Sequence, residues 1–197
     1  MKVAKKALIC IVIFTVLCGA VYPVVITGAS QLLFKDKANG SIIEVNGKKY
    51  GSILLGQQFS GDKYLWGRIM NIDTETFKDS EGNVLMYSTP SNLSPVSTEY
   101  EALVKERVEK IKSSNPDVSE EAIPVDLVTS SGSGLDPHIS VAAADYQIER
   151  VAKARNMEPD EVKDIIEKYT EGRTFGVFGE ERVNVLEVNL ALDGILK

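Results

Sequence analysis

The chain has 197 residues, of which 44% are hydrophobic, and a net charge of −6 at pH 7. Its first 34 residues hold three lysines and no acidic residue, so the remaining 163 residues carry a net charge of −9. This acidity argues against binding to nucleic acid and against adhesion to anionic lipid. A stretch of 163 residues is long enough for one domain with its own hydrophobic core.

An uncharged apolar segment extends from Ala7 to Phe34. About 20 helical residues cross the ~30 Å hydrocarbon layer of a bilayer, and we predict a transmembrane helix over residues 7–27. The three lysines ahead of it favour a cytoplasmic N-terminus, residues 1–6. Residues 28–197 then form an extracytoplasmic domain on a prokaryotic plasma (inner) membrane protein that crosses the bilayer once.

A cleaved signal peptide is the alternative interpretation of this segment. Its apolar part exceeds the usual 7–15 residues, although the small residues from Thr27 to Ser30 could form a cleavage site. A lipoprotein signal fits less well, because Leu17 stands before Cys18 where a small residue is expected. Both cysteines, Cys10 and Cys18, fall within the apolar segment, so the external domain has no disulfide.

In the first half of the domain, residues 39–50 predict a β-hairpin with its turn at Asn46 and Gly47. Residues 57–68 are rich in turn-forming residues and contain the one tryptophan, Trp66, whose role is either core packing or an interface. The polar stretch 71–95 predicts an exposed excursion. A helix should begin near Thr98, whose spacing to Glu101 fits a capping box.

In the second half, residues 124–129 predict a short strand that leads into a glycine-rich turn. A long helix is expected from Pro137 to Arg155 with Asp136 as its N-cap, and another from Pro159 to Gly172. Residues 174–178 are expected to be extended. Residues 183–192 alternate between apolar and polar side chains and predict a strand. The fold class is therefore α+β (mixed α/β), anchored by one N-terminal transmembrane helix.

The glycine- and serine-rich turn is the first candidate for a binding site. A turn that delivers a helix N-terminus presents free N–H groups to an anion. The lysine and the spacing of a P-loop are missing, however. The structural alternative is that Gly132 and Gly134 supply positive φ angles in a tight turn. The candidate nucleotide or anion residues are Ser131, Gly132, Ser133, Gly134, Asp136, His138 and Gln147.

We expect no catalytic residues and no metal site in this chain. Ser131, Ser133, Asp136 and His138 are too close in sequence for a hydrolase triad, whose members usually come from separate elements. His138 is the only histidine, and the predicted external domain has no cysteine, so the ligands of a typical zinc site are missing.

Arginine and aromatic residues suggest surfaces that contact other subunits. Several arginines surround a glycine- and phenylalanine-rich segment near residue 176, although in an acidic domain such arginines more often pair with carboxylates. The candidate interface residues are Trp66, Arg68, Ser91, Asn92, Leu93, Arg150, Arg173, Phe175, Phe178 and Arg182.

Read together, these segments resemble the C subunit of the Kdp potassium-transporting P-type ATPases, the KdpC family. The resemblance rests on VYPVVITG in the apolar segment, GSILLGQQF, YLWGR, SGSGLDPHIS, AADYQIERVAKAR and GRTFGVFGEERVNVLEVNLALD. SNLSP resembles the family's SNLGP, with Ser94 at the usual glycine. Residues 70–89 match the family less well than the segments on either side.

The resemblance implies a non-catalytic accessory subunit that stabilises the assembly of a high-affinity, ATP-driven potassium pump. Its implied partners are a channel-like potassium-binding subunit, a catalytic P-type subunit, a small single-span subunit and the lipid bilayer. ATP and potassium are used by the complex, and no cofactor is firmly bound by this chain. The family has also been proposed to assist nucleotide binding through the Gly-Ser loop and the glutamine at Gln147, but the predicted topology places both away from cellular ATP. The alternative function is a free-standing small-anion-binding domain, membrane-anchored or secreted.

Overall fold

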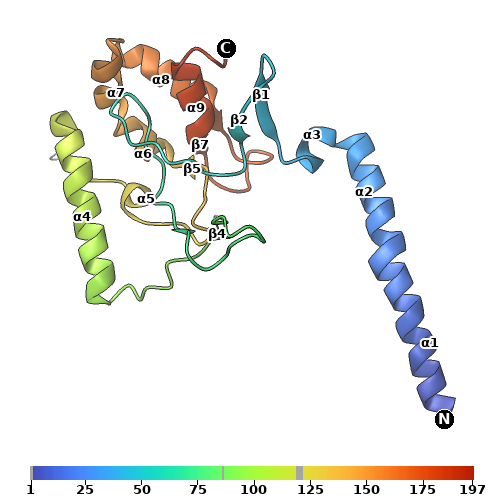
Figure 1. Ribbon diagram of the computed structural model, residues 1–197. Coiled ribbons are helices and arrows are strands. Elements are labelled where there is room, and N and C mark those ends of the chain that lie inside the picture. Colours follow the sequence, from blue (N-terminus) through green and yellow to red (C-terminus); the bar gives the residue numbers. More distant parts are fainter. Residues whose placement is uncertain (1, 86, 119–121) are drawn as a thin grey trace.

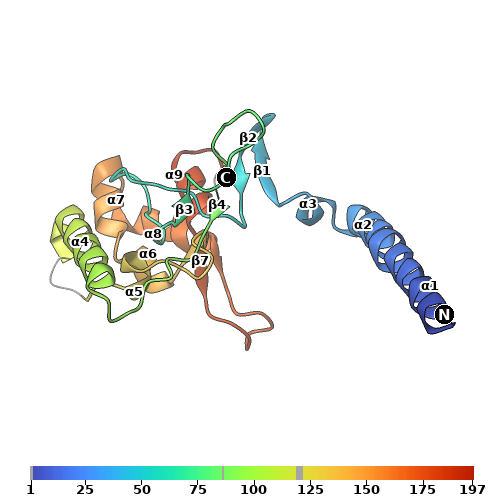
Figure 2. The ribbon, with the colours of Figure 1, turned by 60° about the horizontal axis from the view of Figure 1, so that its bottom comes forward.

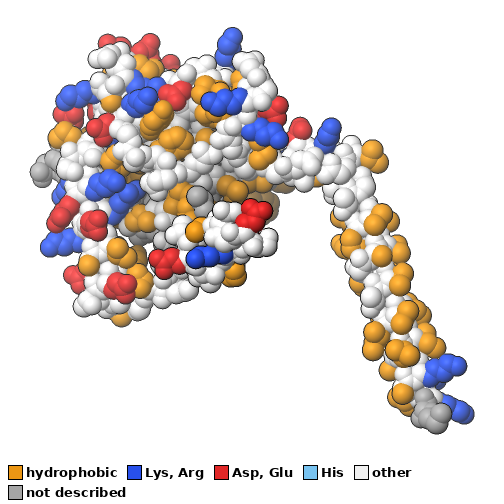
Figure 3. All heavy atoms as spheres, in the orientation of Figure 1, with side chains coloured by type: hydrophobic (Ala, Val, Ile, Leu, Met, Phe, Trp, Pro, Cys, Tyr) orange, Lys and Arg blue, Asp and Glu red, His pale blue; other side chains and the backbone are white. Residues whose placement is uncertain are grey.

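An N-terminal helical rod is joined to a mixed helical and β domain in the computed structural model, which describes residues 2–85, 87–118 and 122–197 (Figure 1). The rod consists of α1 (Lys2–Val16), a π-helical segment (η1, Leu17–Val21) and α2 (Tyr22–Leu33). It has a mean hydropathy of 2.7 and no buried residue, and it is the one helix in the described part of the chain that is long and apolar enough to cross a membrane. Its hydrophobic side chains are visible along its length, with lysines at the N-terminal end (Figure 3).

The domain follows a short helix, α3 (Lys35–Ala38), and contains three small antiparallel sheets. The first two are hairpins, formed by β1 (Ile42–Val45) with β2 (Lys48–Ser52) and by β3 (Ile72–Asp73) with β4 (Tyr87–Ser88). The third has the strand order β5 (His138–Ile139), β7 (Arg182–Asn184) and β6 (Thr170–Glu171). The domain helices are α4 (Thr98–Ser114), the 3-10 turn η2 (Pro116–Val118), α5 (Val125–Val128), α6 (Val141–Asp145), α7 (Ile148–Arg155), α8 (Pro159–Lys168) and α9 (Val185–Leu192).

The core lies where the helices of the domain meet the loop that carries Leu65 and Trp66, both of which are buried. Apolar side chains from the loop, the third sheet and every domain helix form one cluster. Its fully buried members include Ile111, Leu127, Val151, Val162, Val183 and Val188. The α+β fold class is confirmed.

Three sequence predictions are confirmed in their main features. The 39–50 hairpin forms with Asn46 and Gly47 at positive φ in its turn. The helix predicted near Thr98 is α4, although Ser97 caps it by accepting a hydrogen bond from Tyr100 N–H at 3.2 Å. The helix predicted from Pro159 is α8, which ends at Lys168 because the following residues join β6.

Two predictions around the glycine-rich turn are wrong. Residues 125–128 form the helical turn α5 and not a strand. The helix expected from Pro137 begins at Val141, with Ser140 as its N-cap in place of Asp136, because His138 and Ile139 pair with β7. This helix is also interrupted at residues 146–147, between α6 and α7.

The strand predicted over residues 183–192 is also wrong beyond its first two residues. β7 ends at Asn184, and Asn184 Oδ1 then accepts a hydrogen bond from Glu187 N–H at 3.2 Å to cap α9. Six of the eight α9 residues are buried, on more than one side of the helix. Alternating hydrophobicity in this segment therefore reflects a helix enclosed by the core.

Residues 174–178 form a tight turn closed by an isolated bridge between Thr174 and Phe178, so the prediction of an extended segment is wrong. This turn forms the tip of the connection between β6 and β7, and the connection projects from the domain (Figure 2). The excursion 71–95 is mostly exposed as predicted and carries β3 and β4. Met86 within it, and Met1 of the predicted cytoplasmic N-terminus, lie outside the described residues.

Candidate functional site

Two backbone N–H groups of the glycine- and serine-rich turn are hydrogen-bonded within the turn itself. Ser131 Oγ accepts a hydrogen bond from Gly134 N–H at 3.0 Å, and Ser133 Oγ accepts one from Leu135 N–H at 3.2 Å. Gly134 has φ of +72°, and a Cβ at this position would lie 2.7 Å from the carbonyl oxygen of Thr89. The structural explanation of the turn is therefore confirmed at Gly134, whereas Gly132 has no positive φ and open space around it. The turn leads into β5, so no helix N-terminus faces it.

A cluster of charged side chains follows this turn. Arg68 Nη1 lies 3.7 Å from Asp136 Oδ2, and Arg68 Nη2 donates a hydrogen bond to the carbonyl oxygen of Ser130 at 3.1 Å. His138 Nδ1 lies 3.6 Å from Asp136 Oδ1, and His138 Nε2 lies 3.9 Å from Glu171 Oε1. Hydrogen bonding from His138, with a smaller contribution from Arg68, holds the pKa of Asp136 below its ordinary value, although burial acts to raise it. These contacts join the turn, the 57–68 loop and the third sheet.

Gln147, which the resemblance assigns to nucleotide, lies inside the core with no exposed surface. Its Oε1 accepts hydrogen bonds from Trp66 N–H at 2.8 Å and from Arg150 Nη2 at 2.6 Å. Its Nε2 donates to the carbonyl oxygens of Trp66, at 3.1 Å, and Ala143, at 3.0 Å. The Gln147 amide thus makes four hydrogen bonds to protein groups, and none of these groups belongs to the turn residues Ser131–Gly134.

Arg150 and Trp66 are likewise internal. The Arg150 guanidinium lies 4.4 Å from the centroid of the Trp66 ring and donates to the carbonyl oxygen of Tyr64 and to Asn115 Oδ1. Burial lowers the pKa of Arg150 to about 10, and the nearby Asp62 acts in the opposite direction. Both residues were candidates for an interface, and the structure places them in the core, where they fix the 57–68 loop to α7.

The remaining interface candidates lie at or near the surface. Ser91 and Asn92 are exposed and Leu93 is half-buried. Arg173 and Arg182 form ion pairs with Glu180 and Glu171 respectively, as expected for arginines in an acidic domain. Phe175 is 90% exposed and Phe178 67% exposed at the tip of the β6–β7 connection. This tip, the Ser91–Leu93 segment and the two ion-paired arginines are therefore the accessible members of the predicted interface set.

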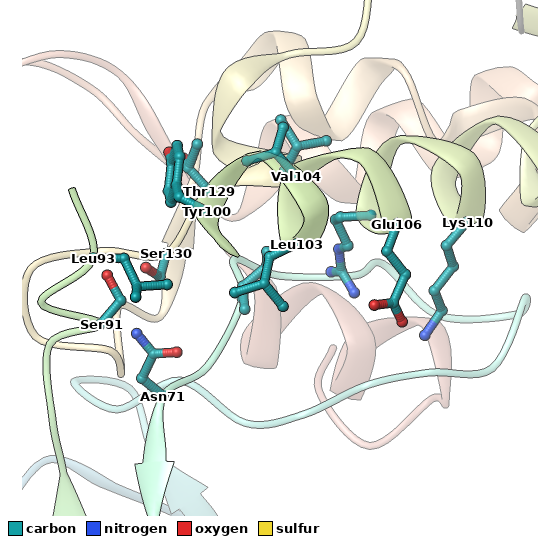
Figure 4. Close-up of a pocket in the computed structure, with 13 residues that line it drawn as sticks. Asn71, Ser91, Leu93, Tyr100, Leu103, Val104, Glu106, Lys110, Thr129 and Ser130 are labelled. Carbon is teal, nitrogen blue, oxygen red and sulfur yellow. The ribbon is translucent and has the colours of Figure 1, made fainter. Parts of the chain in front are cut away.

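A pocket of about 260 Å³ lies beside Leu93, between α4 and the loops at residues 69–71 and 128–130 (Figure 4). Its wall on α4 is formed by Tyr100, Leu103 and Val104, with Glu106, Arg107 and Lys110 further along the helix. Of the residues that line this pocket, only Ser91 and Leu93 were among the candidate site residues predicted from the sequence. The available signal was the helical spacing of the apolar residues Tyr100, Leu103 and Val104 within an otherwise charged segment.

Within the described ranges 2–85, 87–118 and 122–197, no group of three or more His, Cys, Asp or Glu residues is placed to hold a metal ion. His138 has two carboxylates near its ring nitrogens, and both belong to the ion-pair cluster around Arg68 and Arg182.

Comparison with known proteins gives consistent matches over the full chain. Residues 4–194 match the family model described as K+-transporting ATPase, c chain. A Potassium-transporting ATPase KdpC subunit of Clostridium perfringens is 68% identical over 197 residues, covering 100% of both chains. One from Clostridium botulinum is 69% identical, covering 99% of this chain and 97% of the relative. A more distant one from Paraburkholderia xenovorans is 47% identical, covering 96% and 95% respectively.

Proposed function

The chain belongs to the KdpC family, the c chain of K+-transporting ATPases, and from this premise we propose that it stabilises the assembly of an ATP-driven potassium uptake pump. Its partners in this proposal are the channel-like potassium-binding subunit, the catalytic P-type subunit and the small single-span subunit. ATP and potassium are used by the complex, and this chain contributes contacts and no catalytic group.

The observation that carries the proposal is the uncovered apolar helix Lys2–Leu33. None of its residues is buried by the rest of the chain, and it is joined to the domain through the short helix α3. Apolar surface of this extent must be covered by lipid or by partner helices. The helix therefore provides both anchorage and a surface for intramembrane partners.

The orientation follows from charge. Three lysines precede the apolar run at its N-terminal end, and no acidic residue lies before Asp36. By the positive-inside rule, residues 1–6 are cytoplasmic, residues 7–27 span the plasma membrane and residues 28–197 are extracytoplasmic. In this orientation the domain lies over the external side of the membrane-embedded partners.

Nothing observed favours the alternative of a free-standing anion-binding domain. The N–H groups of Gly134 and Leu135 bond to Ser131 and Ser133, and the Gln147 amide is enclosed in the core. At Gly134, Leu135 and Gln147, an anion or nucleotide would have to displace contacts that the chain makes with itself.

The function is tested by purifying the pump in mild detergent from cells that express all subunits, with and without this chain. We expect the chain to co-purify with the large subunits and potassium-stimulated ATPase activity to disappear when the chain is omitted. A chain that purifies alone, from cells in which the other subunits retain full activity, would contradict the proposal.

The orientation is tested separately by cysteine labelling in a background in which Cys10 and Cys18 are replaced by serine. A membrane-impermeant maleimide should label Glu99→Cys in intact cells and Lys5→Cys only after lysis. The reverse pattern would overturn the assigned topology without affecting the assembly role.

A further inference from the structure

The pocket between α4 and the loops at 69–71, 91–93 and 128–130, called here the α4 pocket, combines an apolar wall with one unpaired amide donor and two cations that form no ion pair in the described chain. We propose that it receives a loop of a partner subunit that presents one bulky apolar side chain next to an acidic residue. The inference rests on the proposed function and specifies the chemistry of one contact within it.

The size of the α4 pocket favours a single side chain. Its volume of about 260 Å³ is below the range of roughly 300–1,000 Å³ that is usual for pockets binding small molecules and cofactors. Leu93, Tyr100, Leu103, Val104 and Val128 supply its apolar surface. Interfaces between proteins commonly fill a pocket of this kind with one anchoring aromatic or aliphatic side chain.

The polar end near the start of α4 requires a hydrogen-bond acceptor. Asn71 Nδ2 is buried and has no hydrogen-bond partner among the described residues. Figure 4 shows Asn71 close to Ser91, Leu93 and Ser130 at this end of the pocket. A buried donor without a partner is unfavourable, and a main-chain carbonyl of an inserted loop would satisfy it.

The other end of the α4 pocket is cationic. Arg107 and Lys110 line it together with one acid, Glu106. Neither cation forms an ion pair in the described part of the chain: Arg107 donates to the carbonyl oxygens of Leu127 and Gly67, and Lys110 lies 5.3 Å from the centroid of the Trp66 ring. Although the domain carries a net charge of −9, these two cations make this end of the pocket complementary in charge to a carboxylate.

The proposal is tested in the assembled pump by replacing Leu103 with the photocrosslinker p-benzoylphenylalanine, and separately by replacing Leu93 on the facing wall. Ultraviolet crosslinking followed by mass spectrometry should join both positions to one partner segment that contains a bulky apolar residue beside an aspartate or glutamate. The matched control is Lys105→p-benzoylphenylalanine, because Lys105 is exposed on α4 but does not line the pocket.

The contribution of charge to partner binding is tested in a variant that carries the crosslinker at Leu103 together with Lys110→Glu. This charge reversal should reduce the crosslinked fraction several-fold. The same charge reversal at Lys105 should leave it unchanged. Crosslinks to lipid or to this chain alone, crosslinks to a segment without an acidic residue, or no crosslink in an intact active complex would each overturn the proposal. Absence of the unmodified chain from the complex would instead overturn the proposed function, and this inference with it.

Discussion

Side-chain amides of Gln147 and Asn189 substitute for a neighbouring strand along the segment Leu65–Trp66. Asn189 Oδ1 accepts a hydrogen bond from Leu65 N–H at 2.8 Å while its Nδ2 donates to Leu65 O at 2.9 Å, and Gln147 makes the equivalent pair with Trp66. Buried backbone groups need such partners. The YLWGR segment is thus held in place by polar residues on α9 and before α7.

Replacing Gln147 by leucine should lower the free energy of unfolding by about 3–5 kcal/mol, because it leaves the N–H and carbonyl of Trp66 and part of Arg150 unpaired in the core. The change is measured by urea denaturation in detergent, followed by the fluorescence of the single tryptophan. Glu149→Gln is the control, since Glu149 is exposed on α7. An equal midpoint for Gln147→Leu and the control would contradict the role assigned to the amide.

Asp136 should make the stability of the domain depend on pH in the acidic range. Its pKa is lowered by His138 and Arg68 from an ordinary value of 3.8, so its stabilising contribution is complete above that value and is lost as the pH falls through the folded-state pKa. Asp136→Asn should be less stable than the natural chain at pH 6, and this difference should shrink below pH 3.8. Denaturation midpoints at both pH values check it, and a difference independent of pH would contradict it.

The sequence identified several residues of the candidate site, but it did not predict whether each side chain is buried or exposed. Ser131 and Gly134 belong to a turn whose composition alone implied tight geometry. The burial of Gln147 and Arg150 was not predictable, because polar residues on a helix usually face solvent and only the opposing YLWGR backbone explains their inward position. No sequence pattern indicated Asn71, because its place in the pocket depends on loops that are far apart in the sequence.

At the scale of elements, some local turn and cap signals were reliable, whereas the Asp136-Pro137 cap signal and the alternation over residues 183–192 were not. Asn46-Gly47 and Pro159 marked a hairpin and a helix correctly because these residues act through their own backbone geometry. The segment 185–192 was misassigned because a helix surrounded by core has apolar residues at every spacing, including alternate positions. The start of α6 moved to Val141 because pairing of β5 with β7, a long-range contact, takes residues 138–139.

The helical assignment of α9 can be tested at its cap. Asn184→Ala removes two hydrogen bonds: one that Asn184 Oδ1 accepts from Glu187 N–H, and one that Asn184 Nδ2 donates to the carbonyl oxygen of Ile53. We expect the free energy of unfolding to fall by about 1–2 kcal/mol, measured by urea denaturation. Asn83→Ala, in the exposed excursion, should change it by less than about 0.5 kcal/mol; equal effects would argue against the cap.

The tip of the β6–β7 connection should matter for association and not for folding. Phe175 and Phe178 are exposed and lie outside the core cluster, so the double variant Phe175→Ser, Phe178→Ser should unfold within about 0.5 kcal/mol of the natural chain. Loss of two aromatic anchors should lower the fraction of the chain that co-purifies with the pump several-fold. Unchanged co-purification would exclude the tip as an interface.

At the scale of the whole molecule, the N-terminal rod and the domain are independent in their packing (Figure 1). The rod buries nothing of itself against the domain, and the domain core is built entirely from residues after Gln58. The length of the uncharged apolar run was sufficient to predict one long N-terminal helix ahead of a mixed helical and β domain. Beyond the β1–β2 hairpin, the sheet pairing was not predictable, because β3–β4 and β5–β7–β6 join short segments that lie apart in the sequence.

Removal of residues 2–34 should therefore leave the domain folded with its stability unchanged to within about 1 kcal/mol, and should free it from the membrane. Circular dichroism and the urea midpoint reported by Trp66 fluorescence measure the first effect, and fractionation of cell membranes measures the second. A large drop in the midpoint would show that the helix contributes to the domain core.

The π-helical segment Leu17–Val21 changes the direction in which side chains project along the rod. Its wide turn ends with Tyr22 N–H bonded to the carbonyl oxygen of Leu17, and Pro23 follows, whose ring would clash with the carbonyl of Gly19 in a regular helix. One extra residue in the turn shifts the phase of the helix by about 100°. A stripe of side chains on one side of the rod along α1 is therefore rotated to a different side along α2, so the two halves of the rod present their side chains in different directions.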